Sequence, residues 1–329
     1  MPVPGKRNRI MLGLAVVAAV TVAVGAGIGS ADASTRQHWW GGGRYPQPRP
    51  PVSASPAHGS STGAPSPSAS ASQAPSAPAR PSTTATKGGS WAPPPANAGF
   101  DYQIGGAYPP PAGVGVVSRD HDASPAAGLY NICYVNAFQA QSEANGWWKS
   151  NHPDLLLHNA KGDLVVDKDW NEILLDFSTD AKRAALTAIV GGWMDGCAGK
   201  GFKAIEPDNL DSWTRSGGLL TKAQAVAYAQ SLVGYAHGNG LAVAQKNSAE
   251  LGAASARQIG FDFAVAEQCA DYDECQSYTS VYGANVIVVE YSQSQYTKAC
   301  NAYGGTLSIV LRDVDVTGPG SGSYVFKTC

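Results

Sequence analysis

After Asn97, short apolar runs alternate with longer segments in which apolar and polar residues recur at helical spacing. The apolar runs predict nine strands: Phe100–Ile104, Val114–Val117, Leu129–Val135, Ile173–Phe177, Phe202–Glu206, Leu241–Gln245, Phe261–Ala266, Val286–Glu290 and Thr306–Leu311. Strand–helix alternation over roughly 230 residues predicts an α/β fold, a (β/α)8 TIM-type barrel. Since such a barrel has eight strands, one early strand is an extra strand or not a strand. An open doubly wound sheet is the alternative, but no Gly-rich phosphate loop follows the first strand.

Two of the intervening segments are clear helices, predicted over Thr179–Gly196 and Thr221–Asn239. The first begins at Ser178 or Thr179, with Asp180 in its first turn, where a carboxylate favours the helix dipole. The second combines Thr221 with Gln224 three residues later, the spacing of a capping box.

Polar and aromatic side chains stand where strand after strand ends. They are Asp101-Tyr102-Gln103, Arg119-Asp120, Tyr134, Asp176, Glu206-Pro207-Asp208-Asn209, Lys246-Asn247, Glu267-Gln268, Glu290-Tyr291 and Arg312-Asp313. In a barrel the carboxyl ends of the strands meet on one face, and that face carries the active site. Any one of these ends has a structural explanation, but nine in register indicate a functional face.

Many of these strand ends carry carboxylates, and glycoside hydrolysis needs two of them. One protonates the leaving oxygen, and the other attacks the sugar or activates water. Lys246 among them would lower the pKa of a neighbouring carboxyl and keep it ionised. Aromatic side chains offer flat faces for sugar rings: Tyr102, Tyr134, Trp213, Tyr272 and Tyr291. After Asn97 neither a G-x-S-x-G nor an H-E-x-x-H motif occurs, so serine hydrolase and zinc protease chemistry are disfavoured.

The N-terminus has the pattern of a targeting segment. Lys6, Arg7 and Arg9 precede an apolar run over Ile10–Ile28, and Ala31-Asp32-Ala33 follows as an A-x-A cleavage site. Residues 1–33 are therefore predicted to be a signal peptide. The run is also long enough to serve as an uncleaved membrane anchor, and that alternative stays open.

Residues 34–96 are dominated by Ser, Ala, Pro, Thr and Gly. Such a segment cannot bury enough apolar surface to offset its ordering entropy, so it is predicted to be a disordered linker. Residues 97–329 then form the catalytic domain, presented outside the cell and tethered to the membrane or cell wall if the anchor is retained. We expect this domain to be a monomer.

The net charge limits the expected binding partners, and the cysteines and histidines indicate whether disulfides or metal sites are expected. A net charge of -2 with 15% charged residues gives no basic face, so nucleic acid is not an expected partner. Six cysteines, all after the linker, favour disulfides in an exported chain, and Cys269–Cys275 and Cys300–Cys329 are the expected pairs. No C-x-x-C occurs and no histidines have ligand spacing, so we expect neither a metal nor a cofactor.

Blocks at these strand ends resemble glycoside hydrolase family 114 across 97–329. They are Phe100-Asp101-Tyr102-Gln103, Ile132-Cys133-Tyr134, the E-P-D-N-L-D run that starts at Glu206, Gln245-Lys246-Asn247, the A-E-Q-C-x-x-Y-x-x-C run of Ala266–Cys275 and Val289-Glu290-Tyr291. The resemblance implies a (β/α)-barrel that cleaves within α-1,4-linked galactosamine polymers. A galactosamine-rich polysaccharide is therefore the expected partner.

Carried over by position, the catalytic carboxylates of the family correspond to Asp208, expected as the nucleophile, and Glu267, expected as the acid/base. Glu206 rivals Asp208 because residues two apart on an extended chain point the same way; otherwise it orients its neighbour. The expected substrate-binding residues are Tyr102, Gln103, Asp120, Tyr134, Asp176, Glu206, Asn209, Asp211, Lys246, Asn247, Glu290 and Tyr291.

Galactosamine without its acetyl group is cationic near neutral pH, so an acidic cleft would favour it. Asp120, Asp176, Glu290 and Asp313 are the expected builders of that cleft. Two other functions stay open: a barrel glycosidase acting on another α-linked polymer, and a tethered glycan-binding module without activity. The presence of both Asp208 and Glu267 favours an enzyme.

Overall fold

The computed structural model describes residues 90–329. The predicted signal peptide and nearly all of the predicted linker lie outside the described residues. Within the described range, every helix is too short or too polar to cross a bilayer.

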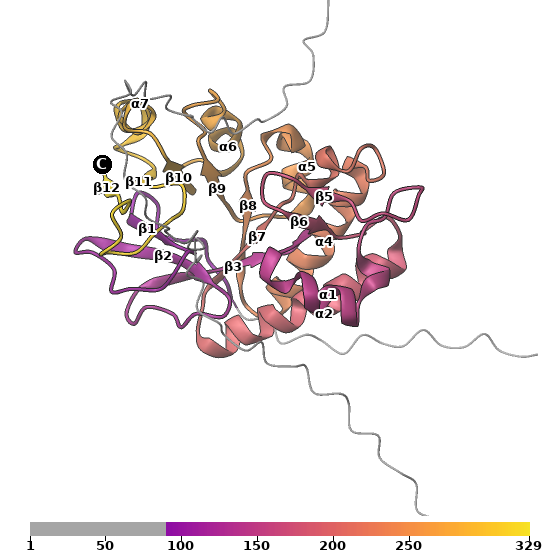
Figure 1. Ribbon diagram of the computed structural model, residues 1–329. Helices are drawn as coiled ribbons and strands as arrows, with labels where there is room; N and C mark the ends of the chain where they lie inside the picture. Colours follow the sequence, from indigo (N-terminus) through magenta and orange to yellow (C-terminus); the bar gives the residue numbers. More distant parts are fainter. Residues whose placement is uncertain (1–89) are drawn as a thin grey trace, which may run out of the picture.

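Eight parallel strands form a nearly closed barrel, as the sequence predicts (Figure 1). In spatial order they are β1 (Gly99–Gln103), β2 (Val114–Asp120), β3 (Tyr130–Asn136), β7 (Ala204–Asp208), β8 (Ala242–Lys246), β9 (Phe263–Glu267), β10 (Val286–Glu290) and β11 (Ser308–Arg312). β12 (Phe326–Thr328) adds to β11 in the antiparallel direction. β1 packs against β11, and a buried ion pair between Asp101 and Arg312 joins the two strands there.

The surplus strand belongs to a separate sheet. β6 (Glu172–Leu174) pairs in the antiparallel direction with β4 (Gln139–Ala140) and with β5 (Val166–Asp167). This small sheet lies between β3 and the next barrel helix in the chain. The prediction of a barrel strand over Ile173–Phe177 is therefore wrong in its placement, and the expectation of one extra early strand is confirmed. The same insertion holds η1 (Ser142–Ala144), α1 (Asn145–Asn151) and η2 (Pro153–Leu155).

Helices cover one side of the barrel more fully than the other (Figure 1). They are α2 (Asp180–Lys200), α3 (Ser212–Arg215), α4 (Lys222–Gly238), η3 (Ala249–Leu251), α5 (Gly252–Ile259), α6 (Cys275–Tyr282) and α7 (Gln293–Tyr303). No helix joins β1 to β2 or β2 to β3. The first connection contains three consecutive prolines, Pro109 to Pro111, and the second contains Pro125. Proline lacks the N–H that a helix needs, so these loops pass over the barrel without helical turns.

The caps of the two predicted helices are confirmed. The Thr179 side chain accepts a hydrogen bond from the Lys182 N–H at the start of α2. At the start of α4, Thr221 and Gln224 form both halves of a capping box. α2 continues one turn beyond the predicted end, to a left-handed Gly201.

The barrel strands are buried on both faces, which explains their nearly continuous apolar runs. Side chains such as Phe100, Val116, Ile132, Val265 and Val289 fill the interior. Alternate residues face the helices in two outer apolar layers.

Three disulfides connect the chain. Cys269–Cys275 and Cys300–Cys329 are confirmed, and the third bond joins Cys133 of β3 to Cys197 of α2. Together they hold the loop after β9, the C-terminus and the insertion.

The chain before β1 lies across the opening at the N-terminal ends of the strands. Trp91 stacks on His237 at the end of α4, and its indole nitrogen donates to Asp262, just before β9. The Ala92 carbonyl accepts a hydrogen bond from Tyr130, the first residue of β3. We call residues 91–94 the N-terminal strap. They fall at the end of the stretch predicted as linker, whose boundary stays a prediction.

Candidate active site

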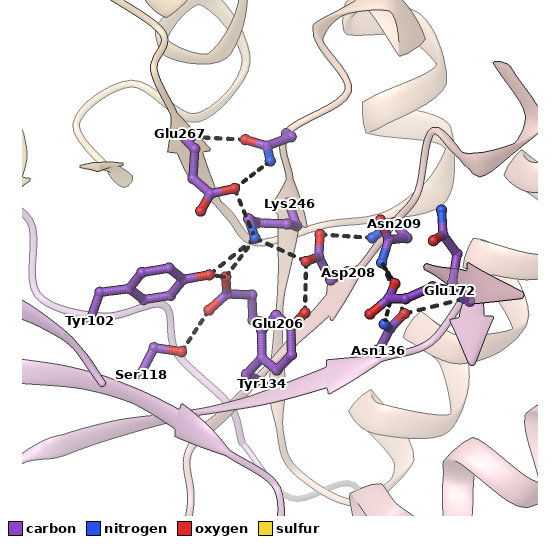
Figure 2. A network of polar contacts seen from close by, with 12 residues as sticks. Tyr102, Ser118, Tyr134, Asn136, Glu172, Glu206, Asp208, Asn209, Lys246 and Glu267 are labelled. Atoms are coloured by element: carbon purple, nitrogen blue, oxygen red, sulfur yellow. Dashed lines mark hydrogen bonds and ion pairs between the residues drawn. The ribbon is translucent and has the colours of Figure 1, made fainter. Parts of the chain in front are cut away.

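A buried lysine joins three carboxylates at the carboxyl ends of neighbouring strands (Figure 2). Lys246 of β8 places its Nζ atom 3.2 Å from Asp208 Oδ2, 3.2 Å from Glu267 Oε2 and 3.5 Å from Glu206 Oε1. Glu206 and Asp208 are two residues apart on β7, and Glu267 ends β9. We call these four residues the Lys246 cluster. Glu206, Lys246 and Glu267 each follow an interior apolar residue by two positions, and Asp208 follows Glu206 by two, so all four point into the barrel mouth.

The backbone turns sharply just after each of these strands. Asn209, Asn247 and Gln268 all have positive φ angles, at 67°, 49° and 56°. Such conformations are uncommon for residues other than glycine and concentrate at functional sites. The left-handed turns end the strands directly behind Asp208, Lys246 and Glu267, and they hold these side chains at the barrel mouth.

Asp208 is held in its ionised form. Burial alone would raise its pKa, but Lys246, the Asn209 backbone N–H and the Tyr134 hydroxyl outweigh burial and leave the pKa below its ordinary range. The Asn209 N–H donates to Oδ1 over 2.7 Å, and Tyr134 donates to Oδ2 over 2.8 Å. The Asp208 side chain is 19% exposed, so its carboxylate can also reach a bound molecule.

Glu206 is enclosed by protein. Its side chain is 0% exposed, and it accepts hydrogen bonds from Tyr102 over 2.8 Å and from Ser118 over 2.6 Å. Burial raises its pKa to about 7, although Lys246 and these two hydroxyls act in the opposite direction. A carboxyl with no exposed surface cannot contact a substrate in this conformation, which favours the orienting role for Glu206 over the nucleophilic one.

Glu267 is positioned by its neighbours on both sides. The Asn247 side chain donates to Oε2 over 2.8 Å and accepts from the Glu267 backbone N–H over 2.8 Å. The Tyr291 hydroxyl donates to Oε1. The Glu267 side chain is 20% exposed. Glu267 and Asp208 are therefore the two members of the Lys246 cluster with carboxylates open to a ligand.

Lys246 itself is fully enclosed, with 1% of its side chain exposed. Burial opposes its charge, but Asp208, Glu267 and Glu206 together raise its pKa well above the ordinary value. It also donates to the Tyr102 hydroxyl over 3.0 Å. The lysine is a fixed cation that holds the carboxylates in place.

The tyrosines bind carboxylates rather than offering open faces. Tyr102 is completely buried and Tyr134 is 8% exposed, so neither ring is available for a sugar to stack on. Tyr291 is partly buried, with its hydroxyl on Glu267. Of the predicted binding residues, Tyr102, Tyr134, Asn209, Asn247 and Tyr291 all contact the Lys246 cluster directly.

Glu172, from the small inserted sheet, also reaches this region (Figure 2). Its Oε2 accepts from Asn136 over 2.9 Å and from Asn209 over 3.4 Å. Burial, the largest cause, and the charge of Asp208 raise the pKa of Glu172 to about 8. The sequence analysis missed Glu172, Asn136 and Ser118. The strand-end rule would have found Asn136, and two-residue alternation would have found Ser118, but no local signal marks Glu172.

The structure does not bring five predicted binding residues into the Lys246 cluster. Gln103 bonds Asp101 and Arg119 on the outer side of the barrel wall. Asp211 is held by Arg215 in an i,i+4 ion pair. Because β1 is buried on both faces, its apolar pattern could not show that Gln103 faces outward. Asp211 lies beyond the end of β7, where strand alternation no longer applies.

The remaining three carboxylates were expected to line an acidic cleft, together with Asp313. Asp120 accepts from the backbone N–H of Asp122 in its own turn. Asp176 pairs with Lys182 of α2, and Asp313 accepts from the backbone N–H of Thr317. Glu290 points to the outer layer of the barrel and accepts from the Ala270 N–H. Each of these carboxyl groups has at least one partner outside the Lys246 cluster, so the expected acidic cleft loses its support from these four residues.

Neither of two other features of the described residues carries a functional assignment. Ligand atoms of Asp120, His121 and Asp122 lie within 4.8 Å of one another; acidic groups of this kind are common without a metal. A cavity of about 630 Å³ lies between the loops after β1 and β2, lined mainly by proline and alanine. Arg119 is the charged residue that lines this cavity, and it already donates hydrogen bonds to Gln103, Ser124 and Tyr108.

Solved structures that are similar to this chain include those of Ega3 and PelA. The structure of Ega3 from Aspergillus fumigatus in complex with galactosamine matches with a TM-score of 0.59 and 21% identity, covering 75% of this chain and 99% of that chain. The glycoside hydrolase domain of PelA from Pseudomonas aeruginosa matches with a TM-score of 0.47 and 14% identity, covering 70% and 97%. No curated protein matches this chain.

The likeness to Ega3 shows a shared fold. The family assignment comes from the sequence: the profile of glycoside-hydrolase family GH114 matches residues 80–329, which is most of the chain and includes the whole barrel. By this match the chain belongs to glycoside-hydrolase family GH114 and is a glycoside hydrolase.

Proposed function

We propose that this protein cleaves within α-1,4-linked galactosamine polymers, using Asp208 and Glu267 as its catalytic pair. The observation that carries the proposal is that both carboxylates are partly exposed and each has an oxygen 3.2 Å from the same Lys246 Nζ. Family membership supports hydrolysis of a glycoside. The galactosamine bound in the Ega3 structure supports the choice of sugar.

In the proposed reaction, Glu267 donates a proton to the leaving glycosidic oxygen while Asp208 attacks the anomeric carbon. The C–O bond to the leaving chain breaks, and an ester bond to Asp208 forms. Glu267 then takes a proton from water, which displaces Asp208 and regenerates both groups. Lys246, Tyr134 and the Asn209 N–H keep Asp208 ionised for the attack.

Retention of anomeric configuration is part of this proposal. Retaining enzymes separate their carboxyl groups by about 5–5.5 Å, and inverting enzymes by about 6.5–9.5 Å. The shared Nζ atom keeps the two contacting oxygens within twice 3.2 Å of each other. This limit favours the shorter separation.

We also propose that the enzyme is exported and acts as a monomer at the end of its linker. The A-x-A site and the positive N-terminus support export. The three disulfides fit an oxidising compartment.

The test is release of oligosaccharides from α-1,4-linked galactosamine polymer by the full chain and by Asp208→Asn and Glu267→Gln. We expect release by the parent chain and a loss of at least about 1,000-fold in each variant, with melting temperatures showing that both stay folded. If a folded parent chain binds the polymer without cutting it, the protein is a binding module. If it neither binds nor cuts, its substrate is another α-linked polymer.

Azide distinguishes the two roles. In a Glu267→Ala variant acting on a glycoside with a good leaving group, azide replaces water at the covalent intermediate and gives a product of retained configuration. In Asp208→Ala, azide takes the place of the missing nucleophile and gives the inverted product. The opposite pattern would exchange the two roles.

A further inference from the structure

Glu172 extends the acidic site beyond the Lys246 cluster, on the side of Asp208. Asn209 follows Asp208 directly, and its side-chain amide donates both to Glu172 Oε2 and to Asn136 Oδ1. The Asn136 amide donates to the same Glu172 oxygen over 2.9 Å. Two amides from two barrel strand ends therefore fix the Glu172 carboxyl beside Asp208 (Figure 2).

This arrangement has more carboxyl groups than cations. Lys246 forms ion pairs with three carboxylates, and Glu172 is a fourth carboxyl beside them. Among the described residues, no lysine or arginine forms an ion pair with Glu172. Arg215, which contacts Asn209, pairs with Asp167 and Asp211 instead. The protein has supplied hydrogen-bond donors to Glu172 but no cation.

The second oxygen of Glu172 is available. Both amides donate to Oε2, and no described residue donates a hydrogen bond to Oε1. The side chain is partly exposed, unlike that of Glu206. With its pKa raised to about 8, Glu172 holds a proton at neutral pH in the free protein. A cation that binds at Oε1 would displace that proton.

We propose that Glu172 binds the ammonium group of a galactosamine unit in the subsite next to Asp208. The amino group of this sugar is on the carbon adjacent to the anomeric carbon that Asp208 attacks, so a carboxylate beside Asp208 is well placed to meet it. The inference rests on the proposed function and deepens it, because it makes the enzyme selective for the free amine. An N-acetyl group is neutral and bulkier, and it gains no ion pair there.

The first test compares kcat/KM on de-acetylated and N-acetylated α-1,4-galactosamine polymers for the full chain and Glu172→Gln. Loss of one charge-assisted contact predicts a decrease of about 10- to 100-fold on the de-acetylated polymer, mainly through KM, and a change below about two-fold on the acetylated one. Asp195→Asn, which removes a charge from the outer face of α2, is the matched control and leaves both values unchanged. Equal losses on both polymers, or no loss on either, would overturn the proposal.

The second test does not depend on catalysis. Calorimetry of galactosamine binding near pH 7, in buffers of different ionisation enthalpy, measures the proton that leaves Glu172. We expect proton release by the parent chain and none by Glu172→Gln, with weaker binding in the variant. If the parent chain cuts no galactosamine polymer but still releases the proton, the proposed function fails and the amine site stands. Equal proton release by both proteins would rule the site out.

Discussion

At the scale of single residues, the site depends on one cation shared by three carboxylates. A buried ion pair is strongly destabilised when one partner is removed, because the other charge is left without compensation. Lys246 has three such partners, and two of them are the proposed catalytic groups. The lysine therefore affects both the ionisation of Asp208 and the stability of the fold.

We expect Lys246→Met to lower kcat by about 100-fold or more, because Asp208 would lose its main electrostatic support. The free energy of unfolding should decrease by about 3–5 kcal/mol near neutral pH, and by less in mild acid, where the carboxylates take up protons. Kinetics and chemical denaturation measure the two effects. Lys203→Met, an exposed lysine just before β7, should change stability by less than about 0.5 kcal/mol. A Lys246 variant with parental kcat would contradict this role.

Stability should also depend on pH in a direction that the raised pKa values set. Burial raises the pKa from the ordinary 4.5 to about 8 for Glu172, about 7 for Glu206 and about 7 for Glu290. Between these limits the folded chain binds more protons than the unfolded chain. The stabilisation is complete below about pH 4.5 and is lost as pH rises through 7 to 8. Asp208 has a lowered pKa, so its contribution to the free energy of unfolding is lost as the pH falls and the carboxylate takes up a proton.

Glu290→Gln tests this argument away from the active site. Glu290 is fully buried, and its Oε2 has no hydrogen-bond partner among the described residues. The variant keeps an oxygen for the Ala270 N–H but cannot ionise. We expect a smaller decrease in melting temperature between about pH 5 and pH 8 than in the parent chain. An unchanged slope would show that Glu290 does not titrate in this range.

At the scale of elements, the caps were the most predictable features, since they depend on residues three apart in the sequence. We expect Thr221→Ala to reduce the free energy of unfolding by about 1 kcal/mol, because the Gln224 N–H at the start of α4 loses its acceptor. Chemical denaturation measures this change. Thr306→Ala, in an exposed turn, should change stability by less than about 0.5 kcal/mol. Equal effects at both positions would remove the cap as the cause.

The inserted sheet is the element that local patterns placed incorrectly. Its strand β6 has the same apolar run as a barrel strand, yet it pairs with two short neighbours from its own insertion. Strand pairing over distance is not encoded in the apolar pattern, so the pattern could not separate this sheet from the barrel. This insertion supplies Glu172, and with it the acidic extension of the site.

At the scale of the whole molecule, the strap and the Lys246 cluster lie at opposite ends of the barrel. The strap contacts residues at the starts of β3 and β9, whereas the cluster stands at the ends of β7, β8 and β9. The chain that precedes the strap therefore joins the domain on the face opposite the Lys246 cluster. A tether attached there would leave the catalytic face free to meet a polymer.

We expect a chain that begins at Asn97 to be less stable than one that begins at Ser90, by about 1–2 kcal/mol, because Trp91 loses its contacts with His237 and Asp262. Differential scanning calorimetry of the two chains measures the change. Trp91→Ala in the longer chain should reproduce most of it. Activity at a temperature where both chains are folded should be the same, and a large loss of activity would show that the strap reaches the catalytic face.

The sequence by itself determined the features that depend on neighbours in the chain. Alternation of strands and helices predicted the barrel, the strand ends located Asp208, Lys246 and Glu267, and spacing predicted two disulfides. Parity along β7 predicted that Glu206 and Asp208 point the same way. The predictions of strands, helices and side-chain direction follow from local geometry that repeats every two to four residues.

Tertiary structure alone decided which of those residues a substrate can reach. Glu206 is enclosed because Tyr102 and Ser118 arrive from strands about a hundred residues earlier in the chain, and Glu172 stands beside Asp208 because an inserted sheet folds back over the barrel mouth. Glu290 points outward because it alternates with the interior residues Ile287 and Val289. The sequence could not show this, because a strand that is buried on both faces has an apolar run that does not distinguish inside from outside. Contacts between distant segments set burial, and burial decided the chemistry of each carboxyl.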